Sequence, residues 1–185
     1  LVWWTVALHL LPSMILAWLA AVLFVRIGEA DDAPARRVLP PPLSWLIVLS
    51  AVLLAGVLVT GTMVTGAGPH AGDARIEAAD RLQMPIQWLV HFHAELMVGY
   101  VCLLIGLAFG LLALRAQGPA IRRCLILIAL IAAQAVVGIT QYQLGVPEVL
   151  VVLHVTLAGA ITAVTGALWA SAVIRDRADG SPRPA

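Results

Sequence analysis

Charged residues are scarce in this chain, lysine is absent, and there are only two cysteines. Charged side chains make up 11% of the 185 residues, whereas an average soluble domain has about a quarter. Hydrophobic residues make up 62%, and the mean hydropathy is +0.99. This composition excludes an ordinary soluble domain and indicates a membrane protein. The net charge of +1 indicates neither a nucleic acid nor an acidic partner.

The two cysteines, Cys102 and Cys124, lie within or at the ends of apolar segments. Such cysteines usually behave as small hydrophobic side chains, so we expect from them neither a disulfide nor a metal site. All eleven basic residues are arginine, a bias that is typical of a GC-rich genome rather than of a particular chemistry.

Five apolar segments are long enough to cross roughly 30 Å of hydrocarbon as helices that rise about 1.5 Å per residue. They predict an all-α fold, that of a polytopic membrane protein with five transmembrane helices, of which the last four form a bundle. The predicted spans are Trp3–Val25, Leu43–Thr65, Pro85–Leu114, Ile121–Tyr142 and Pro147–Ile174.

The predicted domains follow these spans. They are a helix of an incomplete N-terminal half at 1–26, a cytoplasmic linker at 27–42, the four-helix transmembrane bundle at 43–174, and a disordered polar tail at 175–185. The apolar run begins almost at Leu1, with no basic region or cleavage site before it. We therefore expect no signal peptide, and we expect the protein to have further helices upstream.

Arginine is distributed unequally between the two ends of the predicted helices. Only Arg75 and Arg81 fall on one side. The other side has nine, namely Arg26, Arg36, Arg37, Arg115, Arg122, Arg123, Arg175, Arg177 and Arg183. Because arginine-rich segments stay in the cytoplasm, this bias predicts a multi-pass protein of a bacterial plasma membrane with a cytoplasmic C-terminus. The loop G-P-H-A-G-D then lies outside.

Two histidines lie at matched depth in the predicted bundle. His93 follows Pro85 by eight residues and His154 follows Pro147 by seven, which places them about 12 and 10.5 Å below the outer ends of their helices. Ionisable side chains inside a membrane are costly and usually functional. Two facing imidazoles would give an iron two axial ligands, so we predict a haem-binding bundle. The alternative is that each imidazole hydrogen-bonds to a neighbouring helix and holds no cofactor.

His91 points away from His93, because two residues turn a helix by about 200°. We favour His93 as the ligand because it lies deeper. His91 and Glu95 are four residues apart and share a face. They are predicted to form a polar pair at the membrane interface or, alternatively, a proton relay near the haem edge.

His9 and His70 are the remaining histidines. His9, in the first span, is either a packed polar residue or a ligand of a second haem that an upstream helix would complete. His70 lies in the exposed loop, where glycines permit tight turns. The alternative to a structured turn is a lid in which His70, Arg75 or Arg81 contacts haem propionates.

Three stretches resemble the haem A synthase family. They are the loop G-T-M-V-T-G-A-G-P-H-A-G-D with the H-F-H helix after it, the later V-L-H-V-T-L-A-G-A, and the opening V-A-L-H-L-L-P-S-M. Members of the family have eight transmembrane helices in two similar halves, each with a histidine pair. The resemblance implies that this chain is the fourth helix and the whole second half.

The family oxidises a methyl group of haem O to the formyl group of haem A, which cytochrome c oxidase requires. The resemblance implies that His93 and His154 hold the iron of a haem b cofactor, and that His9 is a ligand of the substrate haem O. The implied partners are haem O, the haem O synthase that makes it (protohaem farnesyltransferase), membrane lipid and an unknown electron donor. Association into a homo-oligomer is left open, and the fragment alone is expected to be inactive.

Three features depart from the family pattern. The helix that carries the other first-half histidine, with its nearby glutamate, is absent from this sequence. The family often has arginine after the second-half histidine, whereas Ala94 follows His93 here, and the exposed loop lacks the cysteines of some members. A membrane b-type cytochrome that only relays electrons is the alternative function, since it would need the same histidine pair. A transporter or assembly protein without a cofactor is the third.

Overall fold

The computed structural model describes residues 3–31, 33–69, 77–116 and 118–175. Within these ranges the chain forms five helices that are each long and apolar enough to cross a membrane, which confirms the predicted all-α fold. The helices are α1 (Trp3–Arg26), α2 (Pro41–Ala67), α3 (Ile86–Ala113), α4 (Pro119–Gln143) and α5 (Glu148–Ala170). A short 3-10 helix, η1 (Ala78–Asp80), lies between α2 and α3.

Proline marks the start of four of the helices. Pro41 and Pro119 are the first residues of α2 and α4, while Pro85 and Pro147 immediately precede α3 and α5. Proline suits these positions because the first backbone N–H groups of a helix have no partner within the helix. The observed helices therefore begin close to where the sequence predicts them.

The end of the last helix differs from the prediction. The predicted span continues to Ile174, but α5 ends at Ala170, and the β-branched pair Val173–Ile174 forms strand β2. This strand pairs antiparallel with β1 (Arg36–Arg37), which lies in the predicted linker. β-branched residues favour an extended backbone once the helix has ended. The two-stranded ribbon therefore joins the linker to the end of α5.

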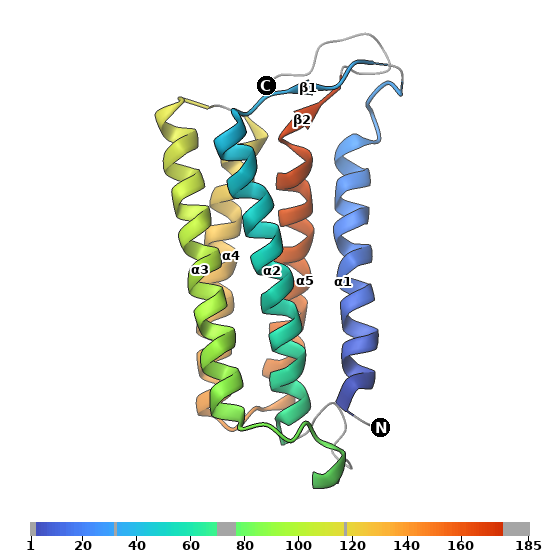
Figure 1. Cartoon of the computed structure of the whole chain (residues 1–185), viewed down its shortest axis with the longest axis vertical. Helices are drawn as coiled ribbons and strands as arrows, with labels where there is room; N and C mark the ends of the chain where they lie inside the picture. The colour runs from blue at the N-terminus through green and yellow to red at the C-terminus, as the bar shows by residue number, and fades with distance from the viewer. Residues whose placement is uncertain (1–2, 32, 70–76, 117, 176–185) are drawn as a thin grey trace.

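Helices α2 to α5 form a four-helix bundle with α1 on its outside (Figure 1). Helix α2 packs against α3 and α5, and α4 packs against the same two helices, so α3 and α5 lie diagonally across the bundle. Helix α1 packs against α5 and α2. We call the end of the bundle at which α3 and α5 begin the outer end, after the orientation that arginine predicts, and the opposite end the inner end.

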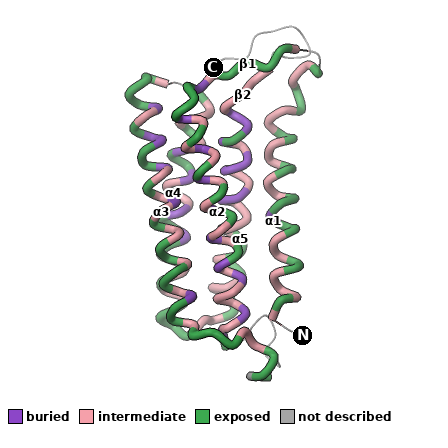
Figure 2. Tube along the Cα trace, viewed as in Figure 1, coloured by how far each residue is buried: buried purple, intermediate pink, exposed green. Residues whose placement is uncertain are grey.

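The densely packed core occupies the inner half of the bundle (Figure 2). Its completely buried side chains include Leu104, Leu107, Leu111, Cys124 and Leu127. In the outer half, α3 has a single buried residue before Tyr100, α4 has none after Gln134, and α5 has none before Ile161. Helix α2 stays buried there at Thr60, Thr62 and Gly66, so the less completely enclosed side chains of this half are those of α3, α4 and α5.

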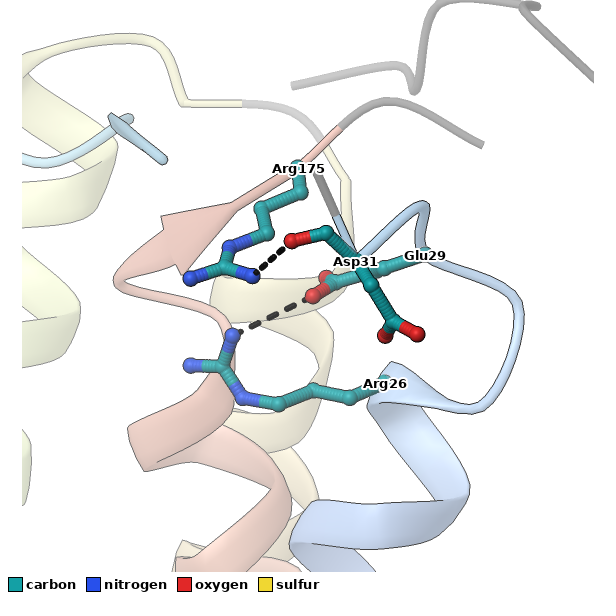
Figure 3. Close-up of polar contacts among 4 residues, drawn as sticks. All are labelled: Arg26, Glu29, Asp31 and Arg175. Carbon is teal, nitrogen blue, oxygen red and sulfur yellow. Dashed lines mark hydrogen bonds and ion pairs between the residues drawn. The ribbon is translucent and has the colours of Figure 1, made fainter. Parts of the chain in front are cut away.

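Polar contacts fasten the chain together at the inner end (Figure 3). Arg26, at the end of α1, forms an ion pair of 3.2 Å with Glu29, and Arg175 donates a hydrogen bond of 3.0 Å to the backbone oxygen of Asp31. Arg175 is the first residue of the predicted disordered tail, and the rest of that tail lies outside the described residues. The linker between α1 and α2 is therefore held against the residues that follow α5.

Helix α1 approaches α5 closely at a glycine. A Cβ atom placed on Gly166 of α5 would lie 2.9 Å from the backbone oxygen of Trp18 on α1. Nearby, the rings of Trp18 and Trp169 meet edge to face with centroids 5.9 Å apart. Small residues allow this kind of backbone approach between transmembrane helices. The lack of a side chain at Gly166 therefore allows α1 to dock against the bundle.

Candidate functional site

His93 is half-buried on α3 and hydrogen-bonds to α2. Its Nδ1 lies 3.1 Å from Oγ1 of Thr60. The Thr60 hydroxyl has one proton, and the backbone oxygens of Gly56 and Val57 lie 2.9 and 3.0 Å from it. If the hydroxyl gives that proton to a carbonyl, it accepts from the Nδ1–H of His93. In this tautomer the other ring nitrogen, Nε2, keeps its lone pair and is able to bind a metal.

Each of the two bundle histidines lies against a glycine of a neighbouring helix. A Cβ atom on Gly61 of α2 would lie 3.3 Å from Cε1 of His93, and one on Gly138 of α4 would lie 2.9 Å from Cε1 of His154. The α2–α3 and α4–α5 pairs thus present their imidazoles in the same way. Any larger residue at either glycine would push against the ring.

His154 is half-buried on α5, and its Nδ1 is buried without a hydrogen-bond partner among the described residues. His93, on α3, is also half-buried. The two histidines are carried by helices that begin at the same end and lie diagonally across the bundle. The predicted pair is therefore brought into the same outer half of the bundle.

A hydrogen bond joins the same two helices on the inner side of the histidines. The hydroxyls of Tyr100 on α3 and Thr165 on α5 are 2.6 Å apart, and both side chains are completely buried. Tyr100 follows His93 by about two turns and Thr165 follows His154 by about three, so each lies on the same face as its histidine. The hydrogen bond therefore joins α3 to α5 on the inner side of both histidines.

Helix α4 adds polar groups that the sequence analysis did not single out. Gln134 donates from Nε2 to the backbone oxygen of His154 at 3.0 Å. The Oε1 atoms of Gln134 and Gln141 are buried and, within the described ranges, have no hydrogen-bond partner. The sequence does contain a pattern that could have identified them. Gln134, Gly138 and Gln141 are spaced i, i+4 and i+7, which places all three on one helix face. Buried polar atoms without partners are typical of sites completed by water or a ligand.

Among the described residues, no group of three or more His, Cys, Asp or Glu side chains could hold a bare metal ion. A pair of imidazoles is suited instead to a haem, whose macrocycle supplies four of the six iron ligands. Three features fit such a group, namely an Nε2 of His93 that keeps its lone pair in the tautomer described above, the glycines behind both rings, and polar atoms of His154 and Gln134 without partners among the described residues. Cys102 and Cys124 are free thiols that take no part.

The other predicted residues of the spans lie apart from this pair. His91 and Glu95 are exposed on α3. Nδ1 of His91 donates to the backbone oxygen of Gln87 at 2.6 Å, so the ring turns back along its own helix rather than towards Glu95. His9 is exposed on α1, which lies outside the bundle. Of the two histidines, His93 hydrogen-bonds to a neighbouring helix and His91 to its own.

Arg81 lies at the outer end, whereas His70 and Arg75 fall outside the described residues. Arg81 borders a cavity of about 320 Å³ that Ala67, Leu82 and Pro85 also line. The Nε atom of Arg81 is buried and has no hydrogen-bond partner in the described part of the chain. The backbone N–H of Leu82 donates to the oxygen of Gly66 at 2.9 Å, which fastens this segment to the end of α2. The segment that carries the guanidinium is thus held at the outer end, beside the end of α2.

Comparison of the chain with models of protein families, with curated proteins and with solved structures finds no match.

Proposed function

We propose that this chain binds a haem b between α3 and α5 through His93 and His154, as the cofactor half of a haem A synthase. The observation that carries the haem proposal is the equivalent placement of the two imidazoles. Each lies against a glycine of the neighbouring helix, and the two come from diagonal helices of one bundle. Cofactor sites of helix bundles are built from inward side chains on facing helices in this way.

The depths of the two histidines support a shared ligand. His93 follows Ile86, the first residue of α3, by seven residues, and His154 follows Glu148, the first residue of α5, by six. Because a helix rises about 1.5 Å per residue, the two depths differ by only about 1.5 Å. Two imidazoles at nearly equal depth on facing helices would be able to hold one haem between them.

The hydrogen bond from His93 to Thr60 supports its role as a ligand. Metal-binding histidines usually donate their second ring N–H to a carboxylate, a carbonyl or another acceptor, which fixes the tautomer and the ring orientation. Thr60 is such an acceptor when its own proton goes to the backbone. His154 has no equivalent partner among the described residues, and Gln134 instead binds the backbone of the same residue. We assign Gln134 the role of positioning this part of α5.

Arg81 supports an orientation with the haem propionates towards the outer end. Guanidinium groups pair well with carboxylates, and the buried Nε of Arg81 has no partner among the described residues. The cavity beside it, of about 320 Å³, opens at the end of the bundle where α3 begins. A propionate in this position would satisfy the guanidinium and hold the macrocycle in register with the two imidazoles.

The step from haem binding to haem A synthesis is supported by the sequence. The loop G-T-M-V-T-G-A-G-P-H-A-G-D and the V-L-H-V-T-L-A-G-A helix are the features that resemble the family. A bound haem supplies the redox chemistry that oxidation of a methyl group requires, while the protein supplies ligation and position. His9 on α1 would be a ligand of the substrate haem O. The C-terminus would lie in the cytoplasm of a bacterial cell.

The test is to express the complete gene in cells that make haem O and to analyse the extracted haems. We expect haem A in these cells, and we expect the His9→Ala variant to lose haem A while its purified protein keeps haem b. Protohaem alone, unchanged when haem O is supplied, would show that the protein is an electron-relaying b-type cytochrome. A colourless purified protein would rule out both functions.

A further inference from the structure

A second cavity lies at the inner end of the molecule, away from the histidines. It has a volume of about 290 Å³ and is bordered by the end of α1, the start of α2 and the residues that follow α5. Two arginines, Arg26 and Arg37, and two tryptophans, Trp45 and Trp169, are among its lining residues. The cavity thus combines positive charge with aromatic surface.

The β-ribbon directs one of its two arginines into this cavity. Arg37 pairs with Val173 and Arg36 pairs with Ile174. Directly opposite residues in an antiparallel pair lie on the same face, and consecutive residues lie on opposite faces. Arg37 and Val173 both line the cavity, whereas Arg36 and Ile174 do not. The ribbon therefore places Arg37, and not Arg36, on the face that borders the cavity.

The charge of the cavity is positive. Arg26 is neutralised in part by its ion pair with Glu29, which is only 6% exposed (Figure 3). Arg37 belongs to no ion pair among the described residues. An anion in the cavity would therefore meet the guanidinium of Arg37, which has no carboxylate partner in the described part of the chain, and that of Arg26, which is paired with Glu29.

The walls of the cavity are suited to a molecule that is also apolar. Trp45 is 65% exposed and Trp169 is 40% exposed, and Ile47 and Val48 complete the wall on α2. The cavity lies where α1 ends and α2 begins, the level at which tryptophan and arginine side chains gather at a membrane interface. A free inorganic anion would use only the arginines and would leave the apolar wall uncovered.

We propose that this cavity binds an anionic phospholipid, with the headgroup phosphate on Arg37 and an acyl chain along Trp45 and Trp169. Basic cavities between transmembrane helices on the cytoplasmic side are suited to acidic headgroups. Arginine also holds phosphate well, because its planar guanidinium donates two parallel hydrogen bonds. The bound lipid would bridge α1 and α2, since Arg26 at the end of α1 and Trp45 on α2 line the same cavity. This proposal is independent of haem binding.

The test measures quenching of tryptophan fluorescence by brominated lipids in reconstituted vesicles. Protein is placed in phosphatidylcholine vesicles that contain a fixed fraction of either brominated phosphatidylglycerol or brominated phosphatidylcholine. We expect stronger quenching by phosphatidylglycerol. Arg37→Gln should weaken the preference about five-fold, which corresponds to the loss of about 1 kcal/mol for one basic residue near the membrane surface. Arg37→Lys should keep most of it.

Arg36→Gln is the matched control, because it removes the same charge from the other face of the ribbon. Equal loss in Arg36→Gln and Arg37→Gln would overturn the proposal in favour of general surface attraction. Equal quenching of the unchanged protein by the two brominated lipids would also overturn it. A third arm adds inorganic phosphate, which we expect to leave the preference for phosphatidylglycerol intact. If inorganic phosphate displaced the lipid, phosphate alone would be the ligand and the proposal would be overturned. Circular dichroism checks that each variant keeps its helical content.

Discussion

The hydroxyl of Tyr100 on α3 donates a hydrogen bond to the hydroxyl of Thr165 on α5 across the bundle, with 2.6 Å between the oxygens. Thr165 gives its own proton to the backbone oxygen of Ile161 at 2.7 Å, which makes Tyr100 the donor. These are the two helices that carry His93 and His154. The bond therefore fixes the separation of the helices on the inner side of the proposed haem.

Replacing Tyr100 with phenylalanine should destabilise the bundle. Hydrogen bonds between transmembrane helices are worth about 0.6 kcal/mol on average and up to about 1.7, and we expect the upper part of this range because both groups are completely buried. Unfolding in a series of detergent mixtures measures the effect. In a double-mutant cycle with Thr165→Val, strictly additive losses would show that the two hydroxyls do not stabilise each other.

Replacing Thr60 with valine should weaken haem binding. Valine keeps the shape of threonine but cannot accept the Nδ1–H of His93, and loss of such a partner typically lowers metal affinity about 10- to 100-fold. Titration of the purified protein with haem measures the affinity. Thr62→Val is the control, because Thr62 is also buried on α2 but bonds to the backbone oxygen of Val59 at 2.7 Å. Equal effects of the two substitutions would contradict the role of Thr60.

Replacing Gly138 with alanine should displace the ring of His154. The new Cβ atom would lie 2.9 Å from Cε1 of that ring, closer than carbon atoms approach, so the ring or the helix must move. We expect reduced haem content with the helical content unchanged. Gly106→Ala is the matched control, because a Cβ atom there meets nothing within 4 Å. Haem content that falls equally in both variants would contradict the prediction.

Replacing Gly166 with alanine should weaken the docking of α1. The new Cβ atom would lie 2.9 Å from the backbone oxygen of Trp18, which cannot rotate away as a side chain can. Overpacking of this kind typically costs about 1–3 kcal/mol, and detergent unfolding measures it. Gly159→Ala, on the same helix and with no atom within 4 Å of its Cβ, should be neutral or stabilising.

Much of the fold could be predicted from the sequence, because hydropathy specifies a transmembrane helix locally. The prolines in the sequence mark the starts of α2 to α5, and the positions of the five spans follow from hydropathy. So does the common starting end of α3 and α5, since one span separates them. The strands β1 and β2 did not follow, because Val173 and Ile174 are as apolar as the helix before them. Their β-branched side chains favour a strand only once a partner is present.

The partners of the histidines could not be predicted, because hydropathy does not specify which helix faces meet. Thr60 resembles any threonine that bonds to its own helix, and it makes such bonds here to Gly56 or Val57. Its contact with His93 depends on the rotation of α2 against α3. The contact of Gln134 with the backbone of His154 depends in the same way on the packing of α4.

The most direct test of the central proposal, that His93 and His154 bind one iron, is the reduced-minus-oxidised spectrum of the purified protein and of three variants. We expect the unchanged protein and His91→Ala to show the same spectrum of a haem with two histidine ligands, because His91 bonds to its own helix. His93→Ala and His154→Ala should each lose that spectrum. Unaltered spectra in both of these variants would contradict the account.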